Sequence, residues 1–293
     1  MPTIQGTVKD SSGNFARRLV RAHRRDSGAV AAETLSNPST GAFSLTVADA
    51  SRHYIVVHDS DAWITYLPLN GANNSTVFEE WGGVPVTAFG TTKISTARPE
   101  FGGSAVFFDG GGAGATNNRL VLGPSPSLSL TGLYSVEIRV YPTAIRAVNQ
   151  LLFTPAATGP VRMDIEANTG KVTILGSSDN ASWLFTSGFV SSNALTLNAW
   201  NHIELTDDGT TCRLFIEGVL AASRATWART TYNGAYLLGG SDAVDRTLAG
   251  YLVDYKVSKG VARHTANFTP SATPYSASMQ RANALIYDHL TPV

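Results

Sequence analysis

The feature that most constrains the fold is a pair of strand-like segments near opposite ends of this 293-residue chain. Residues 53–59 and 283–289 share the apolar, β-branched and aromatic content of strands. The first part of the chain supplies about five short strands, which leave a sheet edge open, and a C-terminal strand would cover it. We therefore predict a discontinuous small β domain, residues 1–61 plus 282–293, that carries an inserted domain, residues 62–281. Insertions are tolerated at loops whose two ends lie close together.

The inserted domain has the pattern of many short strands and no helical periodicity. Its apolar segments number about fourteen, among them residues 161–166, 171–175 and 182–186, with turn residues between them. The 27 glycines suit tight turns, and the 15% of charged residues is below the usual level of roughly a quarter. The sequence predicts an all-β chain, with a small β-sandwich as the frame or anchor and a large jelly-roll sandwich inserted in it.

Charge and cysteine content exclude several classes of partner. The 22 basic and 22 acidic residues balance, so long-range attraction to nucleic acid or to an anionic membrane is not expected. The basic run from Arg17 to Arg25 has no interleaved aromatic residue, and we expect a solvated strand face or a subunit contact there. The single cysteine, Cys212, alternates with Arg213 and is expected to be a buried thiol.

Five motifs of the inserted domain resemble, in the same order, those of the concanavalin A-like, laminin-G-like domains. They begin at Phe101, Tyr134, Trp200, Ala249 and Gly260. The resemblance implies a lectin-like jelly roll that binds its ligand non-covalently. The last motif, which contains Ala262-Arg263-His264, is similar to the versions found in bacteriophage proteins.

The segments outside the insertion resemble the small carboxypeptidase-regulatory-like or fibronectin-like sandwiches of bacteriophage tail proteins. The matching residues include Gly6-Thr7-Val8, Arg18-Leu19-Val20 and Ala284-Leu285-Ile286. Together the resemblances imply a virion component, in a tail fibre or tail tip, that displays a lectin-like domain toward a bacterial surface glycan or receptor. The other partners implied are further phage tail proteins and copies of this chain, with a homotrimer favoured.

The same resemblance sets an expectation for localisation. The first residues have neither the charged region nor the apolar region of a signal peptide, and no apolar run is long enough to cross a bilayer. We expect a protein of the phage virion that is made in the host cytoplasm without a signal peptide and does not insert into membranes.

Two loops mix aromatic rings with hydrogen-bonding side chains, the combination that grips sugars. These loops are residues 179–183 and 227–233. The expected ligand-binding residues are Asn180, Trp183, Trp227, Arg229, Tyr232 and Asn233. The alternative for Trp183 is that its ring packs inward, as tryptophans in strands generally do.

The resemblance also leaves a calcium site open. Asp109 and Asp254 occupy motif positions that supply calcium ligands in relatives, and calcium takes six to eight oxygen ligands. In this chain the loop after Asp109, residues 110–118, has glycine and asparagine where relatives have a second acid. No cofactor is therefore expected to be required, with calcium at Asp109 and Asp254 as the open alternative. In the other interpretation both carboxylates accept N–H bonds from their own turns.

Some glycan-cleaving enzymes share this fold, so carboxylate pairs matter. Asp164 and Glu166 are two residues apart on a predicted strand and would face the same way. Such enzymes usually carry three acids on that strand, and the third position here is Asn168. We predict that the chain is not an enzyme. Two alternatives to receptor binding stay open, namely a purely structural decoration or assembly module of the tail and a glycan hydrolase of concanavalin-like fold.

Overall fold

The structure is a computed structural model of the whole chain that divides into two compact units. The frame unit consists of residues 1–63 and 275–293, and the sandwich unit consists of residues 64–274. The residues described are 2–9, 19–27, 29–37, 39–48, 52–58, 63–78, 84–101, 103–111, 118–185, 188–241, 246–275 and 284–287. Within these ranges the chain is all-β, and its one helical element is a short 3-10 turn, η1 (Pro126–Leu128). No helix in the described part is long and apolar enough to span a membrane.

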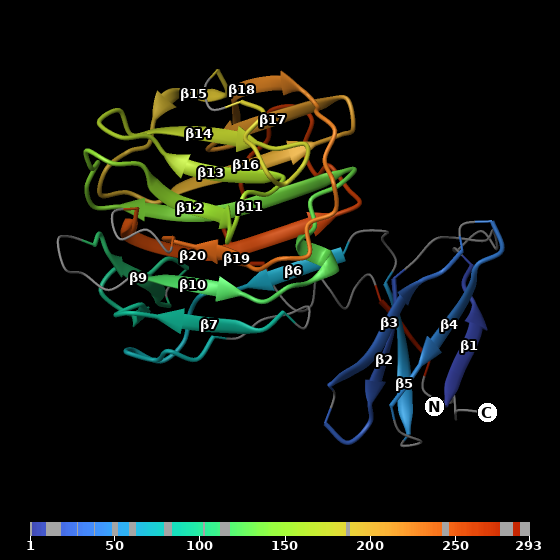
Figure 1. The fold of residues 1–293 in the computed structure, drawn as a ribbon. Helices are drawn as coiled ribbons and strands as arrows, with labels where there is room; N and C mark the ends of the chain where they lie inside the picture. Colours follow the sequence, from blue (N-terminus) through green and yellow to red (C-terminus); the bar gives the residue numbers. More distant parts are fainter. Residues whose placement is uncertain are drawn as a thin grey trace. The chain divides into compact units, whose positions relative to one another are not determined.

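The frame unit contains two antiparallel sheets (Figure 1). The first pairs β1 (Thr3–Thr7) with β4 (Ala42–Thr46). The second has the order β21-β5-β2-β3, from β2 (Leu19–Arg24), β3 (Val30–Leu35), β5 (His53–His58) and β21 (Ala284–Tyr287). Ala284 lies opposite His58 and Tyr287 lies opposite Ile55. The C-terminal segment therefore pairs beside residues 53–58, as the sequence predicts.

Strand alternation builds the core of the frame unit. On β4, Phe43 and Leu45 are buried while their neighbours are exposed. They join a cluster that includes Ile4, Val20 and Ile55, which comes from both sheets. Such a cluster between two sheets is the core of a small β-sandwich.

The solvated strand face expected for the basic run from Arg17 to Arg25 is wrong at Arg21, which is buried and paired within the frame sheet. Arg21 is buried, and its Nε donates to Glu33 Oε2 across the β2–β3 pair at 2.9 Å. Arg17 and Arg18 lie outside the described residues. A buried and paired arginine is not available to contact phosphates along a nucleic-acid backbone.

The sandwich unit consists of two large antiparallel sheets, which Figure 1 shows as two layers. The seven-stranded sheet has the order β15-β14-β13-β12-β19-β10-β7. Its strands are β7 (Val86–Phe89), β10 (Arg119–Leu122), β12 (Gln150–Pro155), β13 (Val161–Ile165), β14 (Lys171–Gly176), β15 (Val190–Ala194) and β19 (Tyr236–Leu238).

The eight-stranded sheet has the order β18-β17-β16-β11-β20-β9-β8, with β6 also pairing β20. Its strands are β6 (Trp63–Leu67), β8 (Lys93–Ser95), β9 (Ala105–Asp109), β11 (Tyr134–Pro142), β16 (Asn201–Asp207), β17 (Thr211–Ile216), β18 (Val219–Ala225) and β20 (Ala249–Lys259). The strand predicted at residues 182–186 is wrong over its described part, residues 182–185, where Phe185 makes only an isolated bridge, to Gly176.

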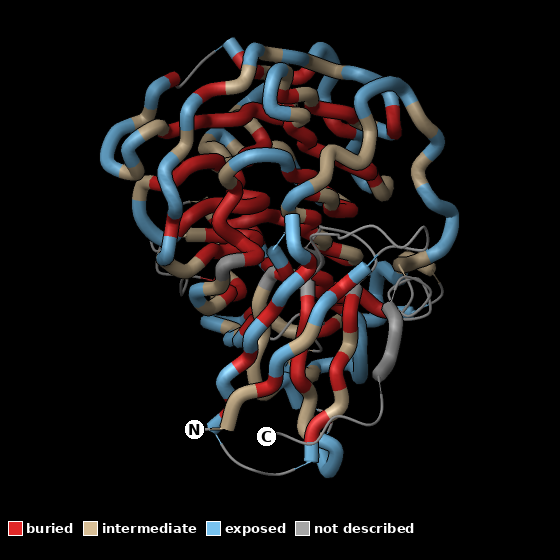
Figure 2. Tube along the Cα trace, turned by 90° about the vertical axis from the view of Figure 1, so that its right-hand side faces the viewer, coloured by how far each residue is buried: buried red, intermediate tan, exposed pale blue. Residues whose placement is uncertain are grey.

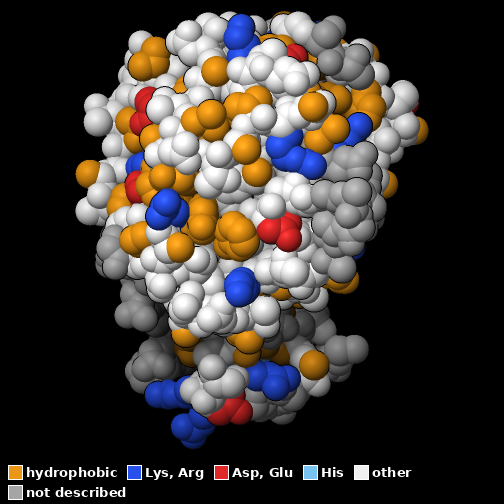
Figure 3. All heavy atoms as spheres, turned by 90° about the vertical axis from the view of Figure 1, so that its left-hand side faces the viewer, with side chains coloured by type: hydrophobic (Ala, Val, Ile, Leu, Met, Phe, Trp, Pro, Cys, Tyr) orange, Lys and Arg blue, Asp and Glu red, His pale blue; other side chains and the backbone are white. Residues whose placement is uncertain are grey.

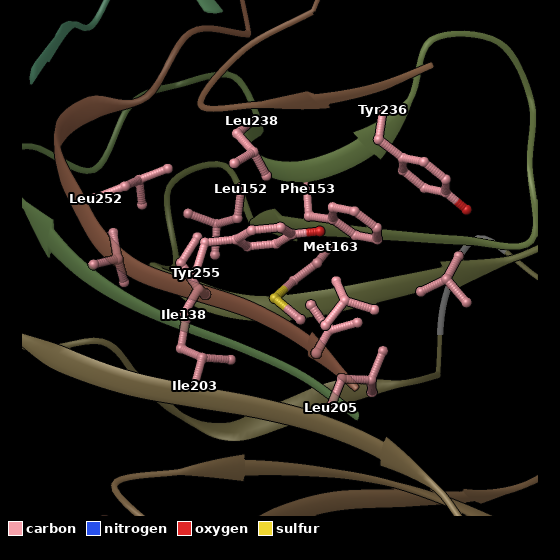
Figure 4. Close-up of a cluster of buried hydrophobic side chains, with 14 of the residues drawn as sticks. Ile138, Leu152, Phe153, Met163, Ile203, Leu205, Tyr236, Leu238, Leu252 and Tyr255 are labelled. Atoms are coloured by element: carbon pink, nitrogen blue, oxygen red, sulfur yellow. The ribbon is translucent and has the colours of Figure 1, made fainter. Parts of the chain in front are cut away.

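The core of the sandwich unit lies between the two sheets. Figure 4 shows side chains from β12, β13 and β19 directed toward side chains from β11, β16 and β20. The rings of Phe153 and Tyr236 stack with centroids 4.5 Å apart. Buried residues run along the strands and exposed residues lie mainly in the connections (Figure 2). On β13 this alternation sends Met163 into the core and Arg162 to the outer face of the seven-stranded sheet.

Cys212 is fully buried in this core, as predicted. Burial raises the pKa of its thiol to about 12, and the nearby Asp207 carboxylate adds to the shift. A thiol with so high a pKa stays protonated and is a poor nucleophile.

The outer face of the eight-stranded sheet is crossed by residues 260–274, which we call the strap. The N–H of Phe268 donates to the carbonyl of Gly218 at 2.9 Å, and the Phe268 ring packs edge-on against Phe215. The imidazole of His264 stacks on Phe268 and bonds Glu204 through Nδ1 at 2.6 Å. The strap therefore covers the part of the outer face that is formed by β16, β17 and the turn after β17.

Charged side chains are sparse on the surface as well as in the sequence. On the side of the molecule in Figure 3, hydrophobic side chains lie scattered among uncharged polar atoms, and the few Lys, Arg, Asp and Glu side chains are interspersed. The described residues on that side form no continuous basic patch of the kind that binds nucleic acid.

Candidate functional site

The outer face of the seven-stranded sheet carries a hollow of about 280 Å³, which we call the outer hollow. It lies over β12, β13 and β19 and is bordered by the segments that follow β12, β14 and β19. Its lining residues are Leu151, Thr154, Pro155, Ala156, Ala157, Thr158, Arg162, Trp183, Leu237, Ser241 and Arg246. Strand alternation places Leu151, Arg162 and Leu237 here, because they point away from the core.

The floor of the outer hollow is apolar and firmly paired. Leu151 and Leu237 are almost fully buried, and Thr154 lies directly opposite Leu237 across the β12–β19 pair. The N–H of Leu151 donates to the carbonyl of Arg246 at 3.0 Å, which ties one rim to the floor. A floor of this kind is rigid, so the groups around it are held in place before a ligand arrives.

One rim is the loop that carries Trp183. The Asp179 carboxylate accepts bonds from the N–H groups of Ala181 and Ser182, both at 2.9 Å, and from the hydroxyls of Ser177 and Ser182. These bonds, those from Ser182 and Ala181 first, hold the pKa of Asp179 well below its usual range. The loop is thereby fixed as an Asx turn, which explains why residues 182–184 are not a strand. Trp183 is left half-buried at the rim.

Arg162 is held from below by Asp164. Its Nε donates to Asp164 Oδ1 at 2.8 Å and its Nη2 to Oδ2 at 2.5 Å, while Asn149 Nδ2 donates to Oδ2 at 3.3 Å. Asp164 is fully buried; burial raises the pKa of its carboxyl, and Arg162 opposes that shift. The two-pronged bond orients the guanidinium, whose Cζ lies 6.0 Å from the Trp183 ring centroid.

The structure brings the two predicted ligand loops together. Asn180 Nδ2 donates to the backbone carbonyl of Thr231 at 3.0 Å, so loops 179–183 and 227–233 are joined. Of the six predicted ligand residues, Trp183 is the one that lines the outer hollow. Asn180 acts as a bridge between the loops, and Asn233 is exposed outside the hollow.

The two other predicted rings are buried. Trp227 is 8% exposed and packs edge-on against Phe185, with centroids 5.0 Å apart. Tyr232 is also 8% exposed and packs edge-on against Tyr236. Both belong to the main core cluster, because apolar rings in a loop above a sandwich are stabilised by turning toward the core. Neither ring presents a free face to a ligand.

Arg229 is held as a structural ion pair. Its Nη1 lies 3.0 Å from Asp207 Oδ2, and the Asp207 side chain is fully buried. Thr226 Oγ1 donates to the same carboxylate oxygen at 2.7 Å. Arg229 therefore fastens loop 227–233 to the end of β16, and its cation is already neutralised.

Sequence reasoning missed Arg162, Arg246 and the threonines of the outer hollow. It searched the loops for rings, whereas Arg162 lies within a strand. The available signal was the alternation over residues 161–165, where Arg162 and Asp164 are interleaved with Val161, Met163 and Ile165. Charged residues on one face of a strand whose other face is apolar indicate an outer sheet surface with a fixed polar arrangement.

The two predicted calcium ligands lie far apart. Ala249 is opposite Asp109 on the β9–β20 pair, so Asp254 is five residues further along β20. At roughly 3.3 Å per residue this is about 16 Å, too far for one ion to contact both. The described residues contain no group of three or more His, Cys, Asp or Glu side chains that could hold a metal. Calcium at either carboxylate stays a prediction.

Both carboxylates already accept hydrogen bonds. Asp109 Oδ1 accepts the N–H of Gly111 at 2.9 Å, which is the turn interaction considered as the alternative, and Oδ2 accepts the Thr91 hydroxyl at 3.0 Å. Asp254 Oδ1 accepts the Tyr66 hydroxyl at 2.5 Å. Most of the loop after Asp109, residues 112–117, lies outside the described residues.

The carboxylate pair considered for catalysis is not arranged in a cleft. Asp164 is buried beneath Arg162, and Glu166 follows the end of β13, where its Oε2 accepts the Thr169 hydroxyl at 2.6 Å. The described lining of the outer hollow contains no carboxylate. The absence of enzymatic activity stays a prediction.

A larger hollow, of about 1040 Å³, lies on the frame unit. It is broad, and its lining has no charged residue and one aromatic residue, Phe43, whose ring belongs to the core. We therefore take the outer hollow, with its half-buried Trp183 ring and two arginines, as the candidate site.

Comparison with known proteins places the sandwich unit in a family. The profile of the concanavalin A-like lectin/glucanases superfamily matches residues 109–265, more than half of the chain, and the chain belongs to this superfamily. No curated protein matches the sequence.

Three solved structures share the fold. Domain 4 of AbnA, a GH43 extracellular arabinanase from Geobacillus stearothermophilus solved in complex with arabinotriose, has a TM-score of 0.51 at 17% identity over 69% of this chain and 94% of that domain. The botulinum neurotoxin serotype D binding domain has a TM-score of 0.50 at 12% identity, over 68% of this chain and 48% of that one. The receptor binding domain of the mosaic serotype C/D toxin has a TM-score of 0.51 at 12% identity, over 71% and 48%. The match spans about half of each toxin domain.

Proposed function

We propose that this chain is a non-catalytic component of a bacteriophage tail whose sandwich unit binds a bacterial surface glycan or receptor at the outer hollow. The observation that carries the proposal is the lining of that hollow, which combines the half-buried Trp183 ring with Arg162, Arg246 and short hydroxyl side chains. Ligand sites generally pair an apolar or aromatic surface with a few fixed polar groups that set orientation.

Glycan binding is supported by the superfamily to which the chain belongs and by its structural neighbours. The superfamily is named for lectins and glucanases, one structural neighbour was solved with arabinotriose, and two others are toxin binding domains. Binding is favoured over hydrolysis because glycosidases generally need two available carboxylates beside the scissile bond. Here Asp164 is committed to Arg162, and the described lining has no other acid.

The phage-tail setting is supported by the sequence motifs of the frame unit and of residues 260–270. In this proposal the discontinuous frame domain anchors or spaces the chain, and the inserted domain faces outward. Other tail proteins and further copies of this chain, as a trimer, are the expected partners, by analogy with proteins of similar architecture.

The burial of Trp227 and Tyr232 favours a second candidate, a purely structural decoration or assembly module. A module of that kind would need rings for packing and none for a ligand. The half-buried Trp183 at the outer hollow favours receptor binding over decoration. A module that only decorates the tail would not need an aromatic ring at the edge of a hollow.

The test is binding of the full chain to a panel of oligosaccharides that includes arabinotriose, and to whole bacterial cells. We expect saturable binding that Trp183→Ala weakens about tenfold, because a sugar face loses its aromatic contact. Leu184→Ala is the matched control, since Leu184 is exposed in the same loop and does not line the outer hollow. An EDTA arm examines calcium, and loss of binding there would assign Asp109 or Asp254 as a ligand.

Folded protein that binds neither glycans nor cells would contradict the receptor-binding proposal and favour the decoration module. Release of shortened oligosaccharides during the same incubations would instead favour the hydrolase.

A further inference from the structure

The charges around the outer hollow are unbalanced. Two guanidinium groups, those of Arg162 and Arg246, line it, and the described lining contains no acid. The charge of Arg162 is matched by the buried Asp164, which bonds it with two prongs. Arg246 is thus the guanidinium in the lining for which the described residues show no such carboxylate partner.

Arg246 is placed so that its charge acts on the hollow. It is half-buried in the connection from β19 to β20, and its carbonyl is anchored to the N–H of Leu151 in the floor. Its positive charge acts on the Asp164 carboxylate, which places it within electrostatic range of the Arg162 side of the hollow. Among the described residues no carboxylate lies within ion-pairing distance of Arg246; residues 242–245, which include Asp242 and Asp245, are outside them.

We infer that the outer hollow binds an anionic glycan, with the acid group on Arg246 and a sugar face on Trp183. This inference rests on the proposed function and specifies its ligand class. A guanidinium presents two parallel N–H donors that match a carboxylate or a phosphate, whereas neutral sugars offer it hydroxyl groups alone. In a half-buried hollow that attraction is screened less than on an open surface.

The size of the hollow sets the extent of the ligand. The volume of about 280 Å³ is just below that of most ligand pockets, which run from roughly 300 to 1,000 Å³. One or two acidic sugar units with their charged group match this volume better than a long stretch of polymer does. Thr158 adds a hydroxyl group to the lining, and the Thr154 hydroxyl, which donates to the Pro155 carbonyl, keeps its oxygen as an acceptor for a sugar hydroxyl.

The test is titration calorimetry of the full chain with three probes. They are oligogalacturonides, the same oligomers with every carboxyl methyl-esterified, and poly(glycerol phosphate). We expect an acidic probe to bind at least tenfold more tightly than the esterified oligomer and to weaken as salt is added. Arg246→Gln is expected to lose about 10- to 100-fold of the acidic affinity, the usual effect of removing a hydrogen bond to a charged group. Arg246→Lys keeps the positive charge, so its affinity for the acidic probe is expected to lie between those of the parent and Arg246→Gln.

Arg98→Gln is the matched control, because Arg98 is exposed and does not line the outer hollow. Binding of either acidic probe with the expected Arg246 dependence supports the inference, and the probe that binds identifies carboxylate or phosphate as the source of the charge. Equal binding of acidic and esterified oligomers, unchanged in Arg246→Gln but weakened in Trp183→Ala, overturns the anionic ligand and leaves glycan binding standing. If no probe and no member of the neutral panel binds, the proposed function fails and the inference fails with it.

Discussion

Tryptophans in adjacent loops of the sandwich unit have opposite surroundings. Trp183 is held at the rim of the outer hollow by the Asp179 turn, whereas Trp227 is 8% exposed against Phe185. The Trp227 Nε1 is buried and has no hydrogen-bond partner among the described residues. Trp227 therefore contributes through its apolar ring, and Trp183 is the ring that stays available to a ligand.

At the residue scale we predict a large loss of stability in Trp227→Ala. Truncation of a buried tryptophan leaves a cavity and is expected to lower the free energy of unfolding by about 3–5 kcal/mol. Trp227→Phe keeps most of the ring and breaks no described hydrogen bond, so a loss below about 1.5 kcal/mol is expected. Trp183→Ala, at the rim, should lose no more than about 1 kcal/mol. Urea denaturation of the three variants measures this order, and a Trp227→Ala variant as stable as the parent would show that this ring is not part of the core.

At the scale of elements, the tight turn between β17 and β18 explains how the strap packs against the eight-stranded sheet. Glu217 and Gly218 both have positive φ, 51° and 72°, which suits a two-residue turn between β17 and β18. A Cβ at Gly218 would run into the carbonyl of Phe268. Glycine is thus needed at this position both for the turn and for the close approach of the strap.

The strap is fastened through a pair of titratable groups, the buried Glu204 and the partly buried His264. Burial raises the pKa of Glu204 to about 8, with the charge of Glu137 adding to the shift, and burial lowers the pKa of His264. Both shifts favour a neutral pair in which the protonated Glu204 carboxyl donates to His264 Nδ1 at 2.6 Å. From about pH 4.5 to about pH 8 the folded chain retains a Glu204 proton that the unfolded chain releases, so this group's contribution to stability falls as pH rises.

We predict that Glu204→Gln removes part of this pH dependence. The amide keeps a donor toward His264 and cannot ionise, so between about pH 6 and about pH 9 the variant should lose less stability than the parent, by on the order of 1 kcal/mol or more. The lowered His264 pKa acts with the opposite sign at the acid end of this window and is common to both proteins. Urea denaturation at the two pH values measures the difference. Glu166→Gln, away from the strap, is the control, and parallel pH profiles for parent and Glu204→Gln would refute the neutral pair.

At the scale of the whole molecule, the last strand of the chain joins a sheet built from strands of its first sixty residues. β21 covers the edge of β5 in the frame unit, with Leu285 opposite Val57. An uncovered strand edge exposes unpaired N–H and C=O groups that can pair with another chain. The C-terminal residues are therefore expected to matter for the frame unit even though they are few.

We predict that a chain ending at residue 275 has a weakened frame unit and an intact sandwich unit. Loss of β21 is expected to lower the free energy of unfolding of the frame unit by about 2 kcal/mol. In so small a unit this corresponds to a fall in its melting temperature of roughly 10 °C or more. Size-exclusion chromatography should show association through the open β5 edge. A chain ending at residue 287 keeps β21 and serves as the control. Unchanged melting and elution of the shorter chain would mean that β21 does not support the frame unit.

Much of the architecture follows from the sequence, because strand period and turn residues are local properties. The alternation over residues 161–165, the motif that begins at Gly260 and the burial of Cys212 could all be recognised without coordinates. The strand expected at residues 182–186 was wrong because the Asp179 side chain holds residues 181 and 182 in a turn, which limits backbone pairing of the described residues to an isolated bridge with Gly176. A side chain that replaces a ladder of backbone bonds leaves no periodic signal.

The sequence by itself determined the all-β class, the pairing of the last strand with residues 53–58, the balanced charge and the lectin-like superfamily. Only the tertiary structure decided which aromatic ring stays available and which arginine has no carboxylate partner among the described residues. The physical reason is that the site joins residues distant along the chain, such as Leu151 in β12 and Leu237 in β19. Alternation shows which face a side chain takes, but burial and ion pairing depend on which strands become neighbours.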